Sequence, residues 1–248
     1  MSGAAIFSLY RSVLLRGWPA ALLLALMMSL LIDRLMLQLP EDLSLEALEQ
    51  LQAFLVSATL WRSLLALGLL SLWPSCALVL CAHHLAGGTK APAAGGLLAA
   101  LRAYPAALLI ALLFSVLVSA GLALLLVPGC YLAGALQWWV VALMVGDAKA
   151  SQCLQQSWRR VSGHWWRSNT TAFIVTICGL GAGTLVSVFA GIAAHLLTAG
   201  LSLDAGARHI VALAVSVLAN FVAAPAYPVA LVVSYRDLEA AGKVARPG

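Results

Sequence analysis

Six long apolar stretches, separated by short polar ones, dominate the pattern of this chain. A helix needs roughly 20 apolar residues to cross the hydrocarbon layer of a bilayer, and each stretch is close to that length. The pattern therefore predicts an all-α membrane protein in which residues 1–248 form one domain and six transmembrane helices pair as three hairpins. The predicted spans cover residues 17–39, 60–82, 104–127, 129–146, 170–198 and 209–235.

Two connecting segments have the spacing of amphipathic helices that lie at the membrane interface. Residues 41–58 place leucines on one face and acidic side chains on another. In residues 147–163, Asp147 is suited to the N-cap, and Arg159 and Arg160 flank an apolar stripe. A basic amphipathic helix indicates contact with anionic lipid, and a loop that only fixes the membrane topology is the alternative.

Composition and charge support the membrane interpretation. Apolar residues make up 63% of the chain, and charged residues only 9%, which is too few to cover a soluble globule of 248 residues. With the N-terminus in the cytoplasm, 11 of the 14 basic residues fall in inner loops and tails. This asymmetry predicts that both termini are cytoplasmic. The net charge of +5 then reflects topology and requires no nucleic-acid partner.

A basic and aromatic stretch precedes each odd-numbered span. Tryptophan and tyrosine prefer the headgroup level of a bilayer, and arginine reaches lipid phosphate there. We therefore expect interfacial helices at these stretches and a cytoplasmic basic-aromatic face that contacts membrane lipids. The candidate lipid-contact residues are Arg102, Trp158, Arg159, Arg160, Trp165, Trp166 and Arg167.

Polar residues within the spans are the candidates for a transport pathway. Gln137, His195 and Asn220 lie in predicted spans, and bonding between helices is the alternative role of each. Pro74 and Pro225 each remove a backbone hydrogen bond and predict a kink, which shapes a bundle or opens a substrate site. No acidic or basic side chain is predicted at mid-membrane, which argues against ion-coupled transport.

No group of residues predicts catalysis, a metal site or a cofactor. Gly179 and Gly183 have the spacing of a helix-packing groove, and no strand precedes them as a phosphate-binding loop requires. His83 and His84 are adjacent and point about 100° apart on a helix, so they do not form a metal pair. Asn169 begins a glycosylation sequon that the predicted topology places in the cytoplasm.

Several short motifs resemble the YciC-like family of uncharacterised bacterial inner-membrane proteins. They are residues 126–129 (Leu-Val-Pro-Gly), 146–149 (Gly-Asp-Ala-Lys) and 156–159 (Gln-Ser-Trp-Arg), together with residues 8–11 and 48–52. The resemblance implies a six-helix protein of the bacterial inner, or plasma, membrane. It carries over no catalytic residue, because the family has no assigned activity.

A more distant resemblance concerns residues 233–238 (Val-Ser-Tyr-Arg-Asp-Leu). They are similar to the closing Tyr-x-Asp-Leu of the six-helix membrane domain attached to some glycerophosphodiester phosphodiesterases, whose catalytic barrel this chain lacks. We expect a non-enzymatic protein that contacts anionic lipid, a membrane-protein partner or a second copy of itself. The alternative is a transporter or lipid-translocating protein with a pathway near Pro74, Asn220 and Pro225.

Overall fold

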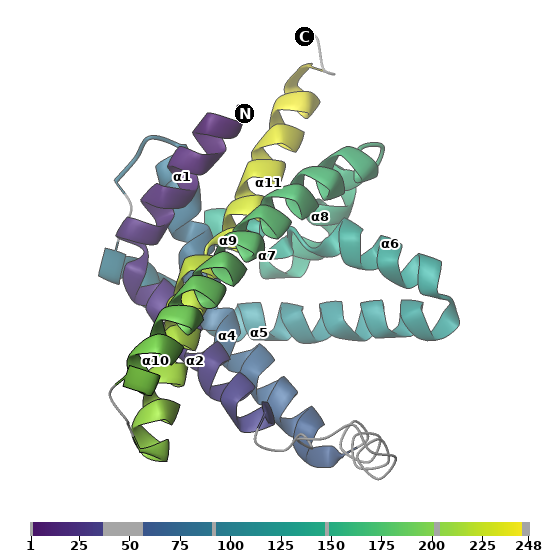
Figure 1. The fold of residues 1–248 in the computed structure, drawn as a ribbon. Helices are drawn as coiled ribbons and strands as arrows, with labels where there is room; N and C mark the ends of the chain where they lie inside the picture. Colours follow the sequence, from purple (N-terminus) through teal and green to yellow (C-terminus); the bar gives the residue numbers. More distant parts are fainter. Residues whose placement is uncertain (1, 37–56, 91–92, 147–148, 201–203, 245–248) are drawn as a thin grey trace.

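The computed structural model describes residues 2–36, 57–90, 93–146, 149–200 and 204–244, and its regular elements are all helical. The predicted all-α class is therefore confirmed for the described chain. The elements, shown in Figure 1, are α1 (Gly3–Arg16), α2 (Trp18–Met36), α4 (Ala58–Ala86), α5 (Ala93–Leu124), α6 (Leu126–Leu136), α7 (Trp139–Val145), the 3₁₀ helix η1 (Ala150–Gln152), α8 (Cys153–Val161), α9 (Trp165–Gly200), α10 (Ala205–Ala223) and α11 (Ala226–Val244).

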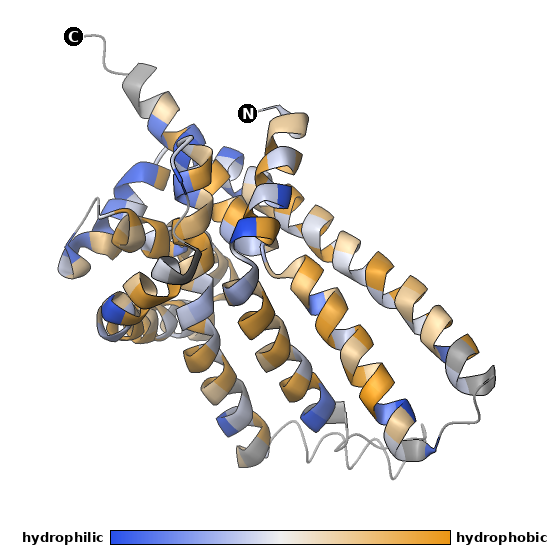
Figure 2. Ribbon diagram, turned by 90° about the vertical axis from the view of Figure 1, so that its left-hand side faces the viewer, coloured by the Kyte–Doolittle hydropathy of each residue, from blue (hydrophilic) through white to orange (hydrophobic). Residues whose placement is uncertain are grey.

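Five described segments are long and apolar enough to cross a membrane, and the α1–α2 pair, which is bent by 83°, makes a sixth if it counts as one span. Figure 2 shows apolar residues along the helices, with hydrophilic residues gathered near the two termini and at the far tips. This distribution is compatible with an integral membrane protein. α1 and the end of α11 lie at the same end of the molecule in both views.

Two of the predicted spans are broken helices. The fourth span is interrupted at Gln137 and Trp138, between α6 and α7, and the sixth at Ala224 and Pro225, between α10 and α11. Pro225 lacks a backbone N–H and so explains the second interruption. The first interruption has no proline, and the sequence did not predict it.

Side chains from other helices satisfy the backbone at both breaks. The last four carbonyls of a helix have no partner within that helix. At the end of α10, the Tyr10 hydroxyl of α1 donates to the carbonyl of Val222. At the end of α6, the buried Ser157 hydroxyl of α8 donates to the carbonyl of Ala135 at 2.8 Å. Each break is thus held by a helix distant in the sequence.

Helix α11 occupies the centre of the core. All residues from 229 to 235 are buried, and α11 packs against α9 and α4, with further contacts to α1 and α8. At the end of this stretch, three consecutive residues project about 100° apart and meet three different helices. Tyr235 lies 4.2 Å beneath the Arg160 guanidinium of α8, Arg236 donates to the His83 and Ala86 carbonyls at the end of α4, and Asp237 pairs with Arg167 of α9.

The α5–α6 hairpin is arranged differently. In Figure 1 it extends sideways, across the direction of α9, and its tip ends away from the other helices. The four apolar residues at the tip, from 124 to 127, are 69–79% exposed. Leu126 and Val127, at the turn between α5 and α6, line the same groove as His164 and Arg167, at the turn between α8 and α9. The sequence predicted the first turn on the outer face of the membrane and the second on the cytoplasmic face. The three-hairpin arrangement is therefore not confirmed.

The predicted interfacial helices are only partly described. Residues 37–56, which hold most of the predicted helix at 41–58, lie outside the described residues, as does Asp147. The second predicted helix is observed only as η1 and α8, from Ala150 to Val161. The basic-aromatic stretch before the third span is continuous with α5, and the one before the fifth span is divided between α8, which holds Trp158 to Arg160, and the start of α9.

Helix α9 approaches α10 and α11 closely at two glycines. A methyl group on Gly183 would lie 2.8 Å from the Cβ atom of Ala223, and one on Gly179 would overlap Ala226. Only a residue without a Cβ atom allows this approach without movement of the backbone.

Candidate functional site

Two grooves lie on either side of the tryptophan pair at the start of α9. The first, called the basic-aromatic groove here, has a volume of about 720 Å³ and runs between α6 and the α8–α9 turn. Its lining includes Leu126, Val127, Tyr131, His164, Trp166 and Arg167. Apolar side chains therefore line it on the α6 side, and polar and charged groups lie at the turn.

Stacked aromatic rings form the inner wall of the basic-aromatic groove. Tyr131 of α6 stacks on Trp165, with ring centroids 5.5 Å apart, and meets Trp158 of α8 edge-on at 5.6 Å. The Trp165 indole N–H donates to the Tyr131 carbonyl at 3.1 Å. Trp166 packs edge-on against Trp165 but is 78% exposed. The wall is thus fixed on its inner side, and Trp166 faces the surroundings.

The predicted lipid-contact arginines fall into two groups. Arg160 and Arg167 are engaged by α11, the first over the Tyr235 ring and the second in a two-bond pair with Asp237 at 3.0 and 3.2 Å. Arg159 of α8 and Arg102 of α5 are exposed, and neither lines the groove. The structure therefore brings together only part of the predicted face.

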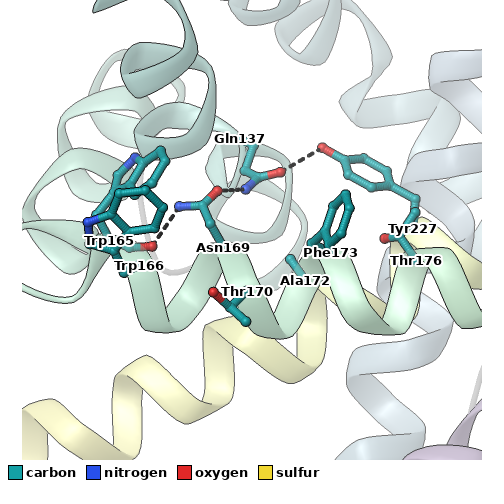
Figure 3. Close-up of a pocket in the computed structure, with 9 residues that line it drawn as sticks. All are labelled: Gln137, Trp165, Trp166, Asn169, Thr170, Ala172, Phe173, Thr176 and Tyr227. Atoms are coloured by element: carbon teal, nitrogen blue, oxygen red, sulfur yellow. Dashed lines mark hydrogen bonds between the residues drawn. The ribbon is translucent and has the colours of Figure 1, made fainter. Parts of the chain in front are cut away.

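The second groove, called the polar groove here, has a volume of about 440 Å³. Figure 3 shows its lining, which includes Gln137, Trp165, Asn169, Phe173, Thr176 and Tyr227. A chain of hydrogen bonds crosses its floor. The Tyr227 hydroxyl donates to Gln137 Oε1 at 3.4 Å, and Gln137 Nε2 donates to Asn169 Oδ1 at 2.8 Å.

The polar groove lies where the two helix breaks face each other. Gln137 comes directly after α6, and Tyr227 is in the first turn of α11. Asn169 of α9 lies between them and donates to the carbonyls of Gly134 at 3.3 Å and Trp165 at 2.8 Å. A Cβ atom on Gly134 would lie 2.7 Å from Asn169 Oδ1, so glycine is required for this contact.

The predicted pathway residues are not brought together. Only Gln137 lies in the polar groove. Asn220 Nδ2 donates to the buried Ser29 hydroxyl of α2 at 2.9 Å, and Ser216 donates to the same oxygen at 3.2 Å. His195 is exposed on the distal half of α9.

Pro74 and Pro225 are both fully buried. Together with the hydrogen bonds of Asn220, this burial favours a packing role at the predicted pathway. We therefore place the candidate site at the two grooves.

Asn169 and Tyr227 are site residues that the sequence did not reveal. Asn169 stood out only as the start of a sequon, and Tyr227 only as one aromatic residue within a span. Their partnership with Gln137 joins residues 32 and 90 positions apart, which no local pattern encodes. The one available signal for Asn169 was its spacing, because a polar side chain four positions after Trp165 lies on the same face of a helix.

Neither groove has the donor set of a metal centre. Among the described residues, no three histidine, cysteine, aspartate or glutamate side chains converge as metal ligands would. The grooves offer hydrogen-bonding groups, aromatic rings, one imidazole, one thiol and one guanidinium.

No family model, curated protein or solved structure matches the chain. The YciC-like resemblance therefore stays a prediction.

Proposed function

We propose that this chain is an integral membrane protein that binds anionic phospholipid in the basic-aromatic groove, without catalysing a reaction. One observation carries the proposal. The groove combines the apolar walls of Leu126 and Val127 with the Arg167 guanidinium and the His164 ring at its rim. A phospholipid has the matching division between acyl chain and charged headgroup.

The guanidinium retains the capacity to bind phosphate. Arginine has five N–H donors, and Asp237 accepts only two hydrogen bonds from Arg167. The Arg167 side chain is 62% exposed, so its other donors face outward. A guanidinium binds phosphate through parallel, charge-assisted bonds, which a neutral headgroup cannot match. The exposed Arg159, next to Trp158, adds positive charge nearby.

The location follows from the same charges. We propose a multi-pass protein of the bacterial inner membrane with both termini in the cytoplasm. The shared position of α1 and the end of α11 supports placing both termini on one side. Trp165 and Trp166 then lie at the headgroup level of the cytoplasmic leaflet, where tryptophan is enriched.

The test measures retention of phosphatidylglycerol against phosphatidylcholine by the detergent-purified chain in native mass spectrometry. We expect preferential retention of phosphatidylglycerol and about tenfold weaker binding in the double variant Arg159→Gln/Arg167→Gln. The matched control is Arg34→Gln/Arg62→Gln, which removes two exposed arginines from α2 and α4.

Two results would overturn the proposal. One is equal retention of the two lipids by the unaltered chain. The other is equal loss of binding in the two double variants, because net charge alone would then explain the preference.

A further inference from the structure

The polar groove contains more hydrogen-bonding groups than its own residues use. Thr170 and Thr176 line it, yet neither makes a side-chain hydrogen bond with a described residue. Gln137 Nε2 has a second hydrogen, and the bond from Tyr227 at 3.4 Å is long enough to yield to a better acceptor. These groups come from α9, from the α6–α7 break and from α11.

In the membrane placement proposed above, on which this inference rests, the groove extends from the interface toward the bilayer centre. Along α9, ten residues separate Trp166 from Thr176, which corresponds to about 15 Å of helix, or half of the hydrocarbon thickness. The tryptophan end lies at the headgroup level. At the depth of Thr176 and Tyr227, acyl chains offer no hydrogen-bond partner, so a polar occupant is favoured there.

The groove has no acidic or basic side chain to receive a charged group. Its polar lining consists of amide and hydroxyl groups, and its walls are formed by Trp165, Trp166 and Phe173. An ionised headgroup without a counter-charge is costly at this depth. Hydroxyl groups both donate and accept, and so match the amide of Gln137 and the threonine hydroxyls.

From this geometry we propose that the polar groove binds an uncharged lipid through the free hydroxyl of its headgroup, with diacylglycerol as the representative class. The hydroxyl lies at the end of the groove formed by Gln137 and the Tyr227 hydroxyl, Thr176 offers a further hydroxyl beside the main-chain end of Tyr227, and the acyl chains lie against Phe173 and leave through the open side of the groove. The site differs from the basic-aromatic groove in ligand chemistry, although Trp165 and Trp166 line both.

The experiment uses the full chain in detergent and lipids with brominated acyl chains, which quench nearby tryptophan fluorescence. Brominated diacylglycerol is compared with brominated triacylglycerol, which has no free hydroxyl, and with brominated phosphatidylglycerol. We expect saturable quenching by diacylglycerol at concentrations at which triacylglycerol gives only a linear background.

The variant Thr176→Val/Tyr227→Phe removes two hydroxyls with little change of shape. We expect it to weaken diacylglycerol binding about tenfold. The control is Thr184→Val, on the same helix, whose hydroxyl instead donates to the carbonyl of Leu180 at 3.0 Å. Circular dichroism and gel filtration establish that each variant is folded.

Equal quenching by triacylglycerol and diacylglycerol would overturn the proposal, as would unchanged diacylglycerol binding in the double variant. If the double variant fails to fold, Tyr227→Phe alone gives the test, because it removes the hydroxyl that the proposal places against the headgroup. The two proposals are separated by their ligands. Loss of phosphatidylglycerol binding in Arg159→Gln/Arg167→Gln concerns the basic-aromatic groove and leaves the diacylglycerol result independent.

Discussion

Residues 229–233 of helix α11 and residues 124–127 at the tip of the α5–α6 hairpin are all apolar, but their surroundings are opposite. Residues 229–235 of α11 are all buried by protein, whereas residues 124–127 at the tip are 69–79% exposed. Hydrocarbon chains are as apolar as leucine, so hydrophobicity alone does not drive one helix against another in a membrane. What separates the regions is the presence of polar side chains with specific partners.

The polar contacts of α11 lie at the end of its buried stretch and in the two residues that follow it. Tyr235, Arg236 and Asp237 attach it to α8, α4 and α9. The stretch 122–130 around the hairpin tip has no charged or hydrogen-bonding side chain apart from the Cys130 thiol. The comparison teaches that a few polar contacts decide which apolar helices become core.

The largest expected effect comes from the same truncation made in both regions. Leu231→Ala removes a fully buried side chain, and we expect a loss of about 2–5 kcal/mol in the free energy of unfolding. Leu126→Ala removes a side chain that is 71% exposed, and we expect a change within about 0.5 kcal/mol. Denaturant unfolding in detergent measures both, and equal losses would break the comparison.

Removal of the α11–α4 attachment should be the next largest effect. Arg236→Ala removes the side-chain donor from the Ala86 carbonyl at the end of α4 and leaves the His83 carbonyl with the Gly87 N–H alone, and we expect a cost of about 1–3 kcal/mol. Arg236→Lys keeps the charge but not the planar fork, so it should recover only part of the stability. A thermal unfolding midpoint for Arg236→Ala equal to that of the unaltered chain would contradict the role assigned to this residue.

The smallest expected effect is a difference in alkylation rate between the Cys153 and Cys130 thiols, and no change in the free energy of unfolding is involved. Cys153 in α8 is buried, and burial raises the pKa of its thiol because the thiolate is poorly solvated there. Its thiolate fraction at neutral pH is therefore reduced, and alkylation should speed up as pH rises. Cys130 near the hairpin tip is exposed.

Peptide mapping after brief treatment with N-ethylmaleimide in detergent measures both sites in one sample. We expect Cys130 to be modified first and Cys153 to follow at higher pH or after unfolding. Equal modification of the two cysteines at neutral pH would show that α8 is not packed as described.

The sequence predicted the elements better than their arrangement. Hydrophobic runs located the helices because span length depends on bilayer thickness, and this physical limit is visible in one dimension. The Gln137–Trp138 break was not predictable, because the side chains that satisfy its backbone, Ser157 and Asn169, lie 20 or more residues away. The sideways course of α5 and α6 was missed because apolar composition does not specify a packing partner.

The candidate site was predictable only at its charged and aromatic rim. Arg159, Trp166 and Arg167 stood out because such residues are rare in an apolar chain. The sequence could not show which of the arginines contact α11 and which face outward, because this depends on where Tyr235 and Asp237 lie. Of the polar groove, the sequence identified Gln137 and the two tryptophans, Trp165 and Trp166, that also line the basic-aromatic groove.

The bond from Tyr10 to Val222 joins residues 212 positions apart. During synthesis, α1 emerges first and must wait for almost the whole polypeptide before its tyrosine finds an acceptor. α1 can pack against α4 as soon as α4 has been made, but this bond has no acceptor until α10 is complete. The contact that holds the end of α10 is therefore among the last to form, although its donor lies on the first described helix.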